Sequence, residues 1–122
     1  MNDRNKCEKW LENYLTPQMS RSAEKIKELF VEDCIYHYGP YYEPRKGLEA
    51  AYQHHKNALS HQHNLKYTWK LLAVTPEFAL AWFDLTLTDD LPDVPNSYQG
   101  IFKFTLDDNG KCSLFEEWYN MA

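Results

Sequence analysis

The sequence predicts one α+β domain in which helices cover one face of a curved antiparallel sheet. Helical periodicity dominates the N-terminal half of the chain, whereas alternation of apolar and polar residues begins after residue 64. A chain of 122 residues suffices for one hydrophobic core, and we interpret residues 1–122 as a single domain.

The N-terminal region is expected to form two helices. Trp10 and Tyr14 lie on one helical face, and Pro17 is expected to end that helix. Ser20 or Ser22 can then cap a second helix, which carries apolar residues at helical spacing up to residue 30.

A short strand and a third helix are expected next. Residues 34–38 form an extended segment that Gly39-Pro40 stops. The third helix is expected to begin at Gly47 and to fade within residues 54–64, which are rich in histidine and asparagine.

The C-terminal half is expected to form four strands. Alternation predicts strands over residues 65–73, 78–87 and 98–106, and a last strand follows over 111–119. The proline-containing residues 89–96 are expected to form a loop. Residues 107–110 predict a hairpin turn, because Asn-Gly tolerates the positive φ that such turns demand.

The charge balance limits the possible partners. The chain has 13 basic and 18 acidic residues, a formal charge of −5 and a pI near 5.5. This balance argues against nucleic acid, whose phosphates require a basic surface, and against an anionic membrane surface. No apolar run approaches the roughly 20 residues that cross a bilayer, and residues 1–9 do not resemble a secretory signal. A cytoplasmic location is expected.

The cysteines and histidines do not suggest a metal centre or a cofactor. Cys7, Cys34 and Cys112 are odd in number and far apart, so they are interpreted as reduced thiols. A group of histidines surrounds the end of the third helix: His54, His55, His61 and His63. Their spacing matches a zinc site only loosely, so they are interpreted as a solvated helix end and loop. No metal and no cofactor are expected.

Two segments carry a resemblance to a known superfamily. Residues 29–34 read Leu-Phe-Val-Glu-Asp-Cys, and residues 43–47 read Glu-Pro-Arg-Lys-Gly before the third helix. With the final strand–turn–strand of residues 104–118, this wording resembles the nuclear transport factor 2-like, or SnoaL-like, superfamily over about residues 8–120. The resemblance implies a cone-shaped cavity between sheet and helices. That fold carries isomerases, dehydratases, epoxide hydrolases, cyclases and non-catalytic binders.

The stretch from Phe30 to Gly47 is most similar to bacterial ketosteroid isomerases. Those enzymes use an Asp base and an oxyanion hole made of a Tyr and a protonated Asp. In this chain the catalytic Tyr falls on Tyr14, but the Asp base falls on Tyr38 and the second Asp falls near Gly100. The chain is therefore not expected to act as a standard ketosteroid isomerase.

Alternation and resemblance together define a candidate pocket. Alternation turns Trp69, Phe83, Tyr98, Phe102 and Phe104 inward. The last strand is ambiguous, since its stripes are Leu114/Glu116/Trp118 and Phe115/Glu117/Tyr119. The resemblance turns Glu116 and Trp118 inward, with Tyr36 and Tyr38 on the first strand, and this leaves His37 outward.

Three functions remain open. The first is a domain that binds a small, largely apolar or aromatic molecule. The second is a lyase, isomerase or cyclase for a small cyclic or polyketide-like substrate, in which Tyr14 and Tyr38 polarise a carbonyl and Glu116 moves the proton. The third is a non-catalytic protein-binding module. An enclosed cavity with convergent polar groups would favour the first two, and a cone filled by its own rings the third.

The outer face of the sheet is expected to bind a second copy. Leu80, Trp82 and Ile101 lie on the face away from the helices. An apolar face of this kind is typical of partner binding, and members of the superfamily commonly dimerise through it. A homodimer is therefore expected.

Overall fold

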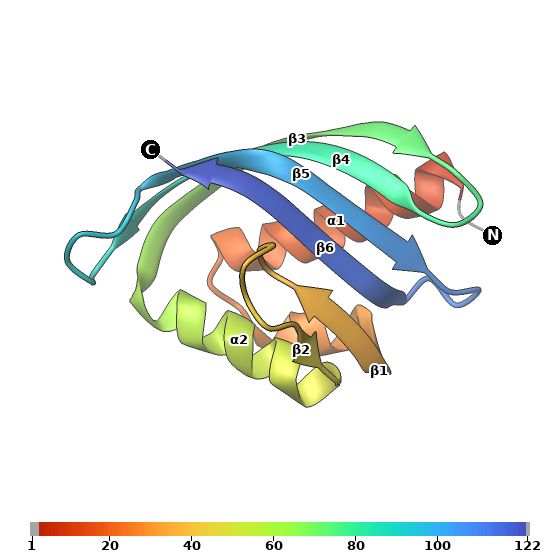
Figure 1. Cartoon of the computed structure of the whole chain (residues 1–122), viewed down its shortest axis with the longest axis horizontal. Helices are drawn as coiled ribbons and strands as arrows, with labels where there is room; N and C mark the ends of the chain where they lie inside the picture. The colour runs from red at the N-terminus through yellow and green to blue at the C-terminus, as the bar shows by residue number, and fades with distance from the viewer. Residues whose placement is uncertain (1–2, 122) are drawn as a thin grey trace.

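The computed structural model describes residues 3–121 and shows two α-helices and a 3-10 helix against the inner face of one curved sheet (Figure 1). The elements are α1 (Arg4–Met19), η1 (Glu24–Glu28), β1 (Phe30–His37), β2 (Arg45–Lys46), α2 (Leu48–His61), β3 (Gln62–Val74), β4 (Ala79–Asp89), β5 (Ser97–Leu106) and β6 (Cys112–Met121). The strand order is β2-β1-β6-β5-β4-β3. The predicted α+β class is confirmed, but β1 pairs with β6 in parallel, so the sheet is mixed.

The first helix does not end at Pro17. Pro17 lies inside α1, which continues to Met19. A proline removes the hydrogen bond to the carbonyl four residues earlier, and that carbonyl belongs to the exposed Asn13, where water can reach it. The expected second helix is only the 3-10 helix η1, and Ile26 is its one buried residue. A segment that buries so little gains no amphipathic face to stabilise a longer helix.

The third helix is longer than the sequence suggested. It begins after Gly47, whose φ of 93° suits glycine and whose N–H donates to the Cys34 carbonyl at 2.7 Å. It continues to His61, because His55 and Leu59 extend the buried face that starts with Ala51. The interpretation of residues 54–64 as a fading helix and loop is therefore wrong.

A β-bulge sets which side chains of β6 face inward. Leu106 pairs with Cys112, but the next pair is Thr105 with Leu114, so β6 contains one extra residue, Ser113. A shift of one residue exchanges the two faces of a strand.

Aromatic rings fill the narrow end of the cone. Trp10 of α1 stacks on Phe104 with ring centroids 4.8 Å apart, and Phe83 stacks on Phe102 at 4.1 Å.

Cys7, Cys34 and Cys112 are buried free thiols. No helix in residues 3–121 is long and apolar enough to cross a membrane.

Candidate functional site

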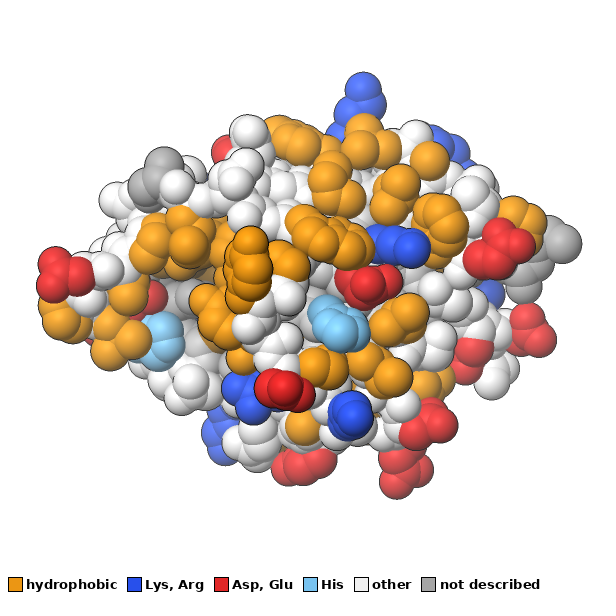
Figure 2. Space-filling model, in the orientation of Figure 1, with side chains coloured by type: hydrophobic (Ala, Val, Ile, Leu, Met, Phe, Trp, Pro, Cys, Tyr) orange, Lys and Arg blue, Asp and Glu red, His pale blue; other side chains and the backbone are white. Residues whose placement is uncertain are grey.

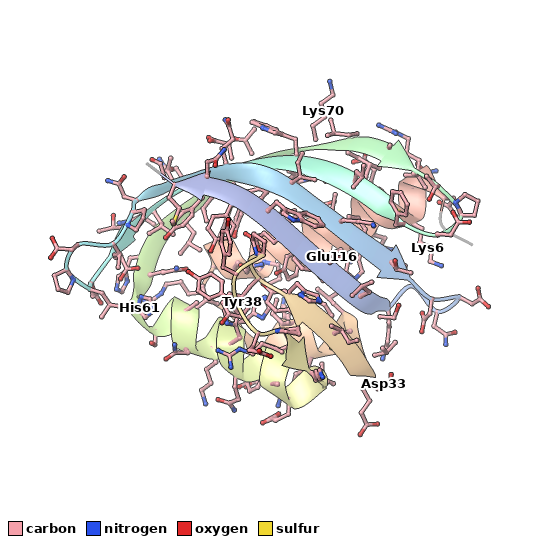
Figure 3. The ribbon with its side chains drawn as sticks, viewed as in Figure 1. Lys6, Asp33, Tyr38, His61, Lys70 and Glu116 are labelled. Carbon is pink, nitrogen blue, oxygen red and sulfur yellow. The ribbon has the colours of Figure 1, made fainter. Side chains whose placement is uncertain are left out.

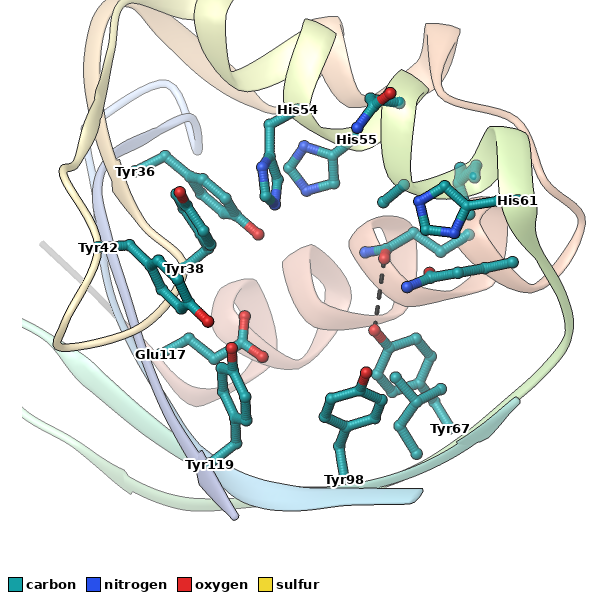
Figure 4. A pocket seen from close by; sticks show the side chains of 16 residues that line it. Tyr36, Tyr38, Tyr42, His54, His55, His61, Tyr67, Tyr98, Glu117 and Tyr119 are labelled. Carbon is teal, nitrogen blue, oxygen red and sulfur yellow. Dashed lines mark hydrogen bonds between the residues drawn. The ribbon is translucent and has the colours of Figure 1, made fainter. Parts of the chain in front are cut away.

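A cavity of about 370 Å³ opens at the wide end of the cone, between α2, the β1–β2 connection and the inner face of the sheet (Figure 4). Six tyrosines line it: Tyr36, Tyr38, Tyr42, Tyr67, Tyr98 and Tyr119. The cavity is thus walled by aromatic rings and rich in hydroxyl groups, which suits a small molecule with oxygen atoms.

Glu117 supplies the one carboxyl group in the lining of this cavity. It lies on the inner stripe of β6, between the fully buried Phe115 and the lining Tyr119. The Glu117 side chain makes no hydrogen bond or ion pair within residues 3–121, and burial raises its pKa from 4.5 to about 8. The carboxyl group is therefore mostly protonated at neutral pH.

The expectation that Glu116 and Trp118 face the cavity is wrong. Glu116 lies on the outer face of β6, 4.0 Å from the Lys103 ammonium, and the Trp118 side chain is exposed. The bulge at Ser113 is the cause, because it exchanges the inward and outward stripes of β6. Figure 2 shows hydrophobic side chains beside acidic and basic ones over the sheet.

Tyr14 lies behind the cavity rather than in it. Its side chain is 2% exposed, and its hydroxyl lies 3.0 Å from the Tyr36 hydroxyl and 2.9 Å from His55 Nε2. His55 Nδ1 lies 2.7 Å from the Ala51 carbonyl, which can only accept, so Nδ1 carries the proton. The direction of these three hydrogen bonds follows. Tyr36 donates to Tyr14, Tyr14 donates to His55 Nε2, and His55 Nδ1 donates to the Ala51 carbonyl.

This direction leaves the Tyr36 oxygen with acceptor capacity toward the cavity. Burial lowers the pKa of His55 to about 4, so the imidazole stays neutral and can accept from Tyr14. The Tyr14 proton is therefore committed to His55, and Tyr14 is not free to polarise a bound carbonyl.

Three histidines of α2, His54, His55 and His61, line the cavity, although their sequence pattern predicts a solvated helix end and loop. The His54 ring lies 4.3 Å from the Tyr38 ring and 5.3 Å from the Tyr36 ring, centroid to centroid. Burial, with smaller effects from His55 and Arg45, lowers the pKa of His54 to about 3. The spacing of His55 four residues after the buried Ala51 was the one signal available.

The other sequence-predicted site residues divide into two groups. Tyr36, Tyr38 and Tyr98 line the cavity, and Figure 3 shows Tyr38 between the sheet and α2 while Lys70 points away from the sheet. The residues outside the lining are Trp69, Phe83, Phe102 and Phe104. The three phenylalanines belong to the ring cluster of the narrow end, where close stacking leaves no space for a ligand. His37 is also absent from the lining.

No side chain fits at Gly100. A Cβ there would lie 1.9 Å from the backbone oxygen of Trp118 on the neighbouring strand. The second Asp of the ketosteroid isomerases therefore has no steric equivalent at this position.

Two His–Asp pairs join the junction of α2 and β3 to the end of β4 and the residue that follows it. His61 Nδ1 lies 2.8 Å from Asp89 Oδ1, and His63 Nε2 lies 2.7 Å from Asp90 Oδ2. Of these four residues, His61 alone lines the cavity. Residues 3–121 contain no group of three or more His, Cys, Asp or Glu side chains with metal-binding geometry.

Comparison with solved structures identifies the architecture. A suspected isomerase of Bacillus subtilis aligns with a TM-score of 0.85 at 17% identity, over 98% of this chain and 90% of that one. SalBIII, an epoxide hydrolase/cyclase-like enzyme of pyran ring formation in the polyether salinomycin, aligns at 0.82 and 17% over 99% and 95%. The chain has the nuclear transport factor 2-like fold. An epoxide hydrolase of Mycobacterium tuberculosis aligns at 0.77 and 12% over 95% and 84%.

Neither a protein-family model nor a curated protein matches the sequence. The alignments to these solved structures, at 12–17% sequence identity, establish the nuclear transport factor 2-like fold and no activity.

Proposed function

We propose that this protein is a small-molecule enzyme of the isomerase or epoxide hydrolase/cyclase type, in which Glu117 transfers a proton to or from the substrate. One observation carries the proposal: an unpartnered carboxyl group, with a pKa raised to about 8, faces an open aromatic cavity. A structural role would pair such a group, whereas an acid–base catalyst needs it free and titrating near neutral pH.

The chemistry follows from the protonation state. Protonated Glu117 can donate its proton to an epoxide oxygen while the carbon–oxygen bond breaks. It can equally donate to a carbonyl oxygen on which negative charge develops. The tyrosine hydroxyls around the cavity can donate hydrogen bonds to the same oxygen, and Tyr38 is the candidate for this role. The lining has no Lys or Arg, and its buried histidines are neutral, so the substrate is expected to be uncharged.

The open cavity also bears on the alternatives. The narrow end of the cone is filled by rings, but the wide end holds about 370 Å³ of space. This volume supports a small-molecule ligand over a protein-binding module, since a module that binds only proteins needs no internal cavity. A binding domain without catalysis would not need an unpartnered acid at the cavity wall.

The test compares two neighbouring carboxyl groups. Glu117→Gln keeps the shape of the cavity and removes the transferable proton, while Glu116→Gln removes the outer-face neighbour. Both variants and the wild type are assayed with small neutral epoxides and with β,γ-unsaturated ketones. We expect turnover of at least one probe, a loss of about 100-fold or more in kcat for Glu117→Gln, and a wild-type rate for Glu116→Gln. Equal rates in all three proteins would refute the proposal.

A further inference from the structure

His61 and Asp89 form a histidine–carboxylate dyad on the wall of the cavity. The Asp89 side chain is 5% exposed, and its Oδ1 accepts from His61 Nδ1 at 2.8 Å and from the Leu91 backbone N–H at 2.9 Å. The His61 side chain remains 22% exposed and lines the cavity. The carboxylate is thus buried and fixed, and the imidazole that it holds reaches solvent.

The hydrogen bond to Asp89 determines which ring nitrogen is available. A carboxylate only accepts, so Nδ1 of His61 carries a proton and, in the neutral ring, Nε2 keeps its lone pair. Nε2 of His61 makes no hydrogen bond within residues 3–121. An oriented imidazole with a free Nε2 is the arrangement that general bases use, with the carboxylate stabilising the imidazolium once it forms.

The dyad lies across the cavity from the acid. Figure 4 shows His61 on the α2 side and Glu117 on the β6 side, with the cavity between them. We propose that His61 is the general base and Asp89 its positioning residue, so that substrate is opened between a base and an acid. This inference rests on the proposed function and narrows it to ring opening by an activated nucleophile, because a simple proton shift needs only one acid–base group.

The proposed epoxide opening uses the base and the acid together. His61 Nε2 removes a proton from a water molecule, or from a hydroxyl group of the substrate, and the oxygen attacks one epoxide carbon. The carbon–oxygen bond breaks, and its electron pair takes the proton of Glu117. Water then gives a diol, and an internal hydroxyl gives a cyclic ether. The proton on His61 returns to the Glu117 carboxylate through solvent, which restores both groups.

The chain contains a matched control for the purely structural role of such pairs. His63 and Asp90 make the same kind of contact one step along the sheet, but their side chains are 34% and 62% exposed and neither lines the cavity. Both pairs tie the junction of α2 and β3 to the C-terminal end of β4. A structural role is therefore shared by the two pairs, and a catalytic role belongs to one of them.

The experiment measures epoxide opening with styrene oxide, limonene oxide and a hydroxy-epoxide that can cyclise. We compare His61→Ala and Asp89→Asn with His63→Ala and Asp90→Asn. We expect kcat to fall about 100-fold in His61→Ala and at least about 10-fold in Asp89→Asn, with KM within about threefold of wild type. The two controls should retain the wild-type kcat, and added imidazole should restore part of the activity of His61→Ala.

A second measurement needs no variant and no substrate. Nitrogen NMR of the wild type should show that the neutral ring of His61 carries its proton on Nδ1 and not on Nε2. The opposite tautomer would overturn the dyad. A His61→Ala variant with wild-type kcat, found together with an inactive Glu117→Gln variant, would also overturn it. That second result would leave the proposed function of Glu117 intact. If the wild type isomerises the ketones but opens no epoxide, the ring-opening inference fails alone. If it acts on neither class, both proposals fail.

Discussion

Glu117, the buried His55 and the partly buried His54 are uncharged in the folded protein at neutral pH for one physical reason. Each side chain has left water for an aromatic cavity, which disfavours the charged form. Burial raises the pKa of Glu117 to about 8 and lowers those of His54 and His55 to about 3 and 4. The cavity therefore presents neutral donors and acceptors, and its residues shift the stability of the fold in opposite pH ranges.

Glu117 is expected to reduce stability as the pH rises. Its folded pKa of about 8 exceeds its unfolded value of 4.5, so the folded state binds more protons between these limits. The free energy of unfolding should fall by roughly 2–3 kcal/mol as the pH rises through that window. This is less than the full pKa shift would give, because solvent in the open cavity screens the carboxyl group. Urea unfolding of wild type and Glu117→Gln at pH 5 and pH 8 tests this. A variant with the wild-type pH slope would contradict it.

His55 is expected to reduce stability as the pH falls. Its folded pKa of about 4 lies below its unfolded value of 6.5, so the unfolded chain takes up the proton first. Between pH 7 and pH 5 this should cost roughly 2 kcal/mol of unfolding free energy. His55→Gln is less stable at pH 7, since it breaks the bond from Tyr14, but its loss from pH 7 to pH 5 should be smaller. His37→Gln, away from the cavity, is the control, and an equal slope for His55→Gln would refute the prediction.

At the scale of elements, the strands of the second half could be predicted and the face of β6 could not. The inward stripes of β4 and β5 follow from alternation, because Phe83, Phe102 and Phe104 need burial. On β6 each stripe holds one glutamate and at least one large aromatic residue, so residue type alone does not show which stripe is buried. The bulge at Ser113 decides, and its position depends on pairing with β5 rather than on local sequence.

Gly100 marks a close approach of β5 and β6. A methyl group there would meet the Trp118 carbonyl at 1.9 Å, and the backbone atoms that it meets cannot rotate away. Gly100→Ala is expected to separate the two strands locally and to cost about 2–3 kcal/mol of unfolding free energy. Gln99→Ala, on the exposed neighbouring position, should change stability by less than about 0.5 kcal/mol. Urea unfolding measures both variants, and a fully stable Gly100→Ala protein would disprove the close approach.

At the scale of the whole molecule, the cone has two different ends. The predicted fold is confirmed. The sequence pattern predicts a pocket along the whole length of the cone. In the structure, rings fill the narrow end and the cavity occupies the wide end. Alternation tells which residues face inward and not how far along the cone they lie. The α2 histidines were missed for a related reason, since a helix face is visible in sequence only when its residues are apolar.

The outer face of the sheet remains without a partner in residues 3–121, and we expect it to bind a second copy of the chain. Trp82, Ile101 and Trp118 lie in one cross-strand row, and Lys103 pairs with Glu116 beside it. A twofold contact requires a self-complementary surface, and this face offers both apolar side chains and both signs of charge. Trp82→Glu would place a charge inside that contact.

The expected result is a folded monomer of 14.5 kDa for Trp82→Glu and twice that mass for the wild type, measured by light scattering. Tyr41→Glu is the control, because Tyr41 is 97% exposed on the β1–β2 connection, off this face. It should keep the wild-type mass, since losing an exposed ring elsewhere leaves the contact intact. A Trp82→Glu protein with an unchanged mass would place the interface elsewhere, and a monomeric wild type would show that the sheet face has no second copy to bind.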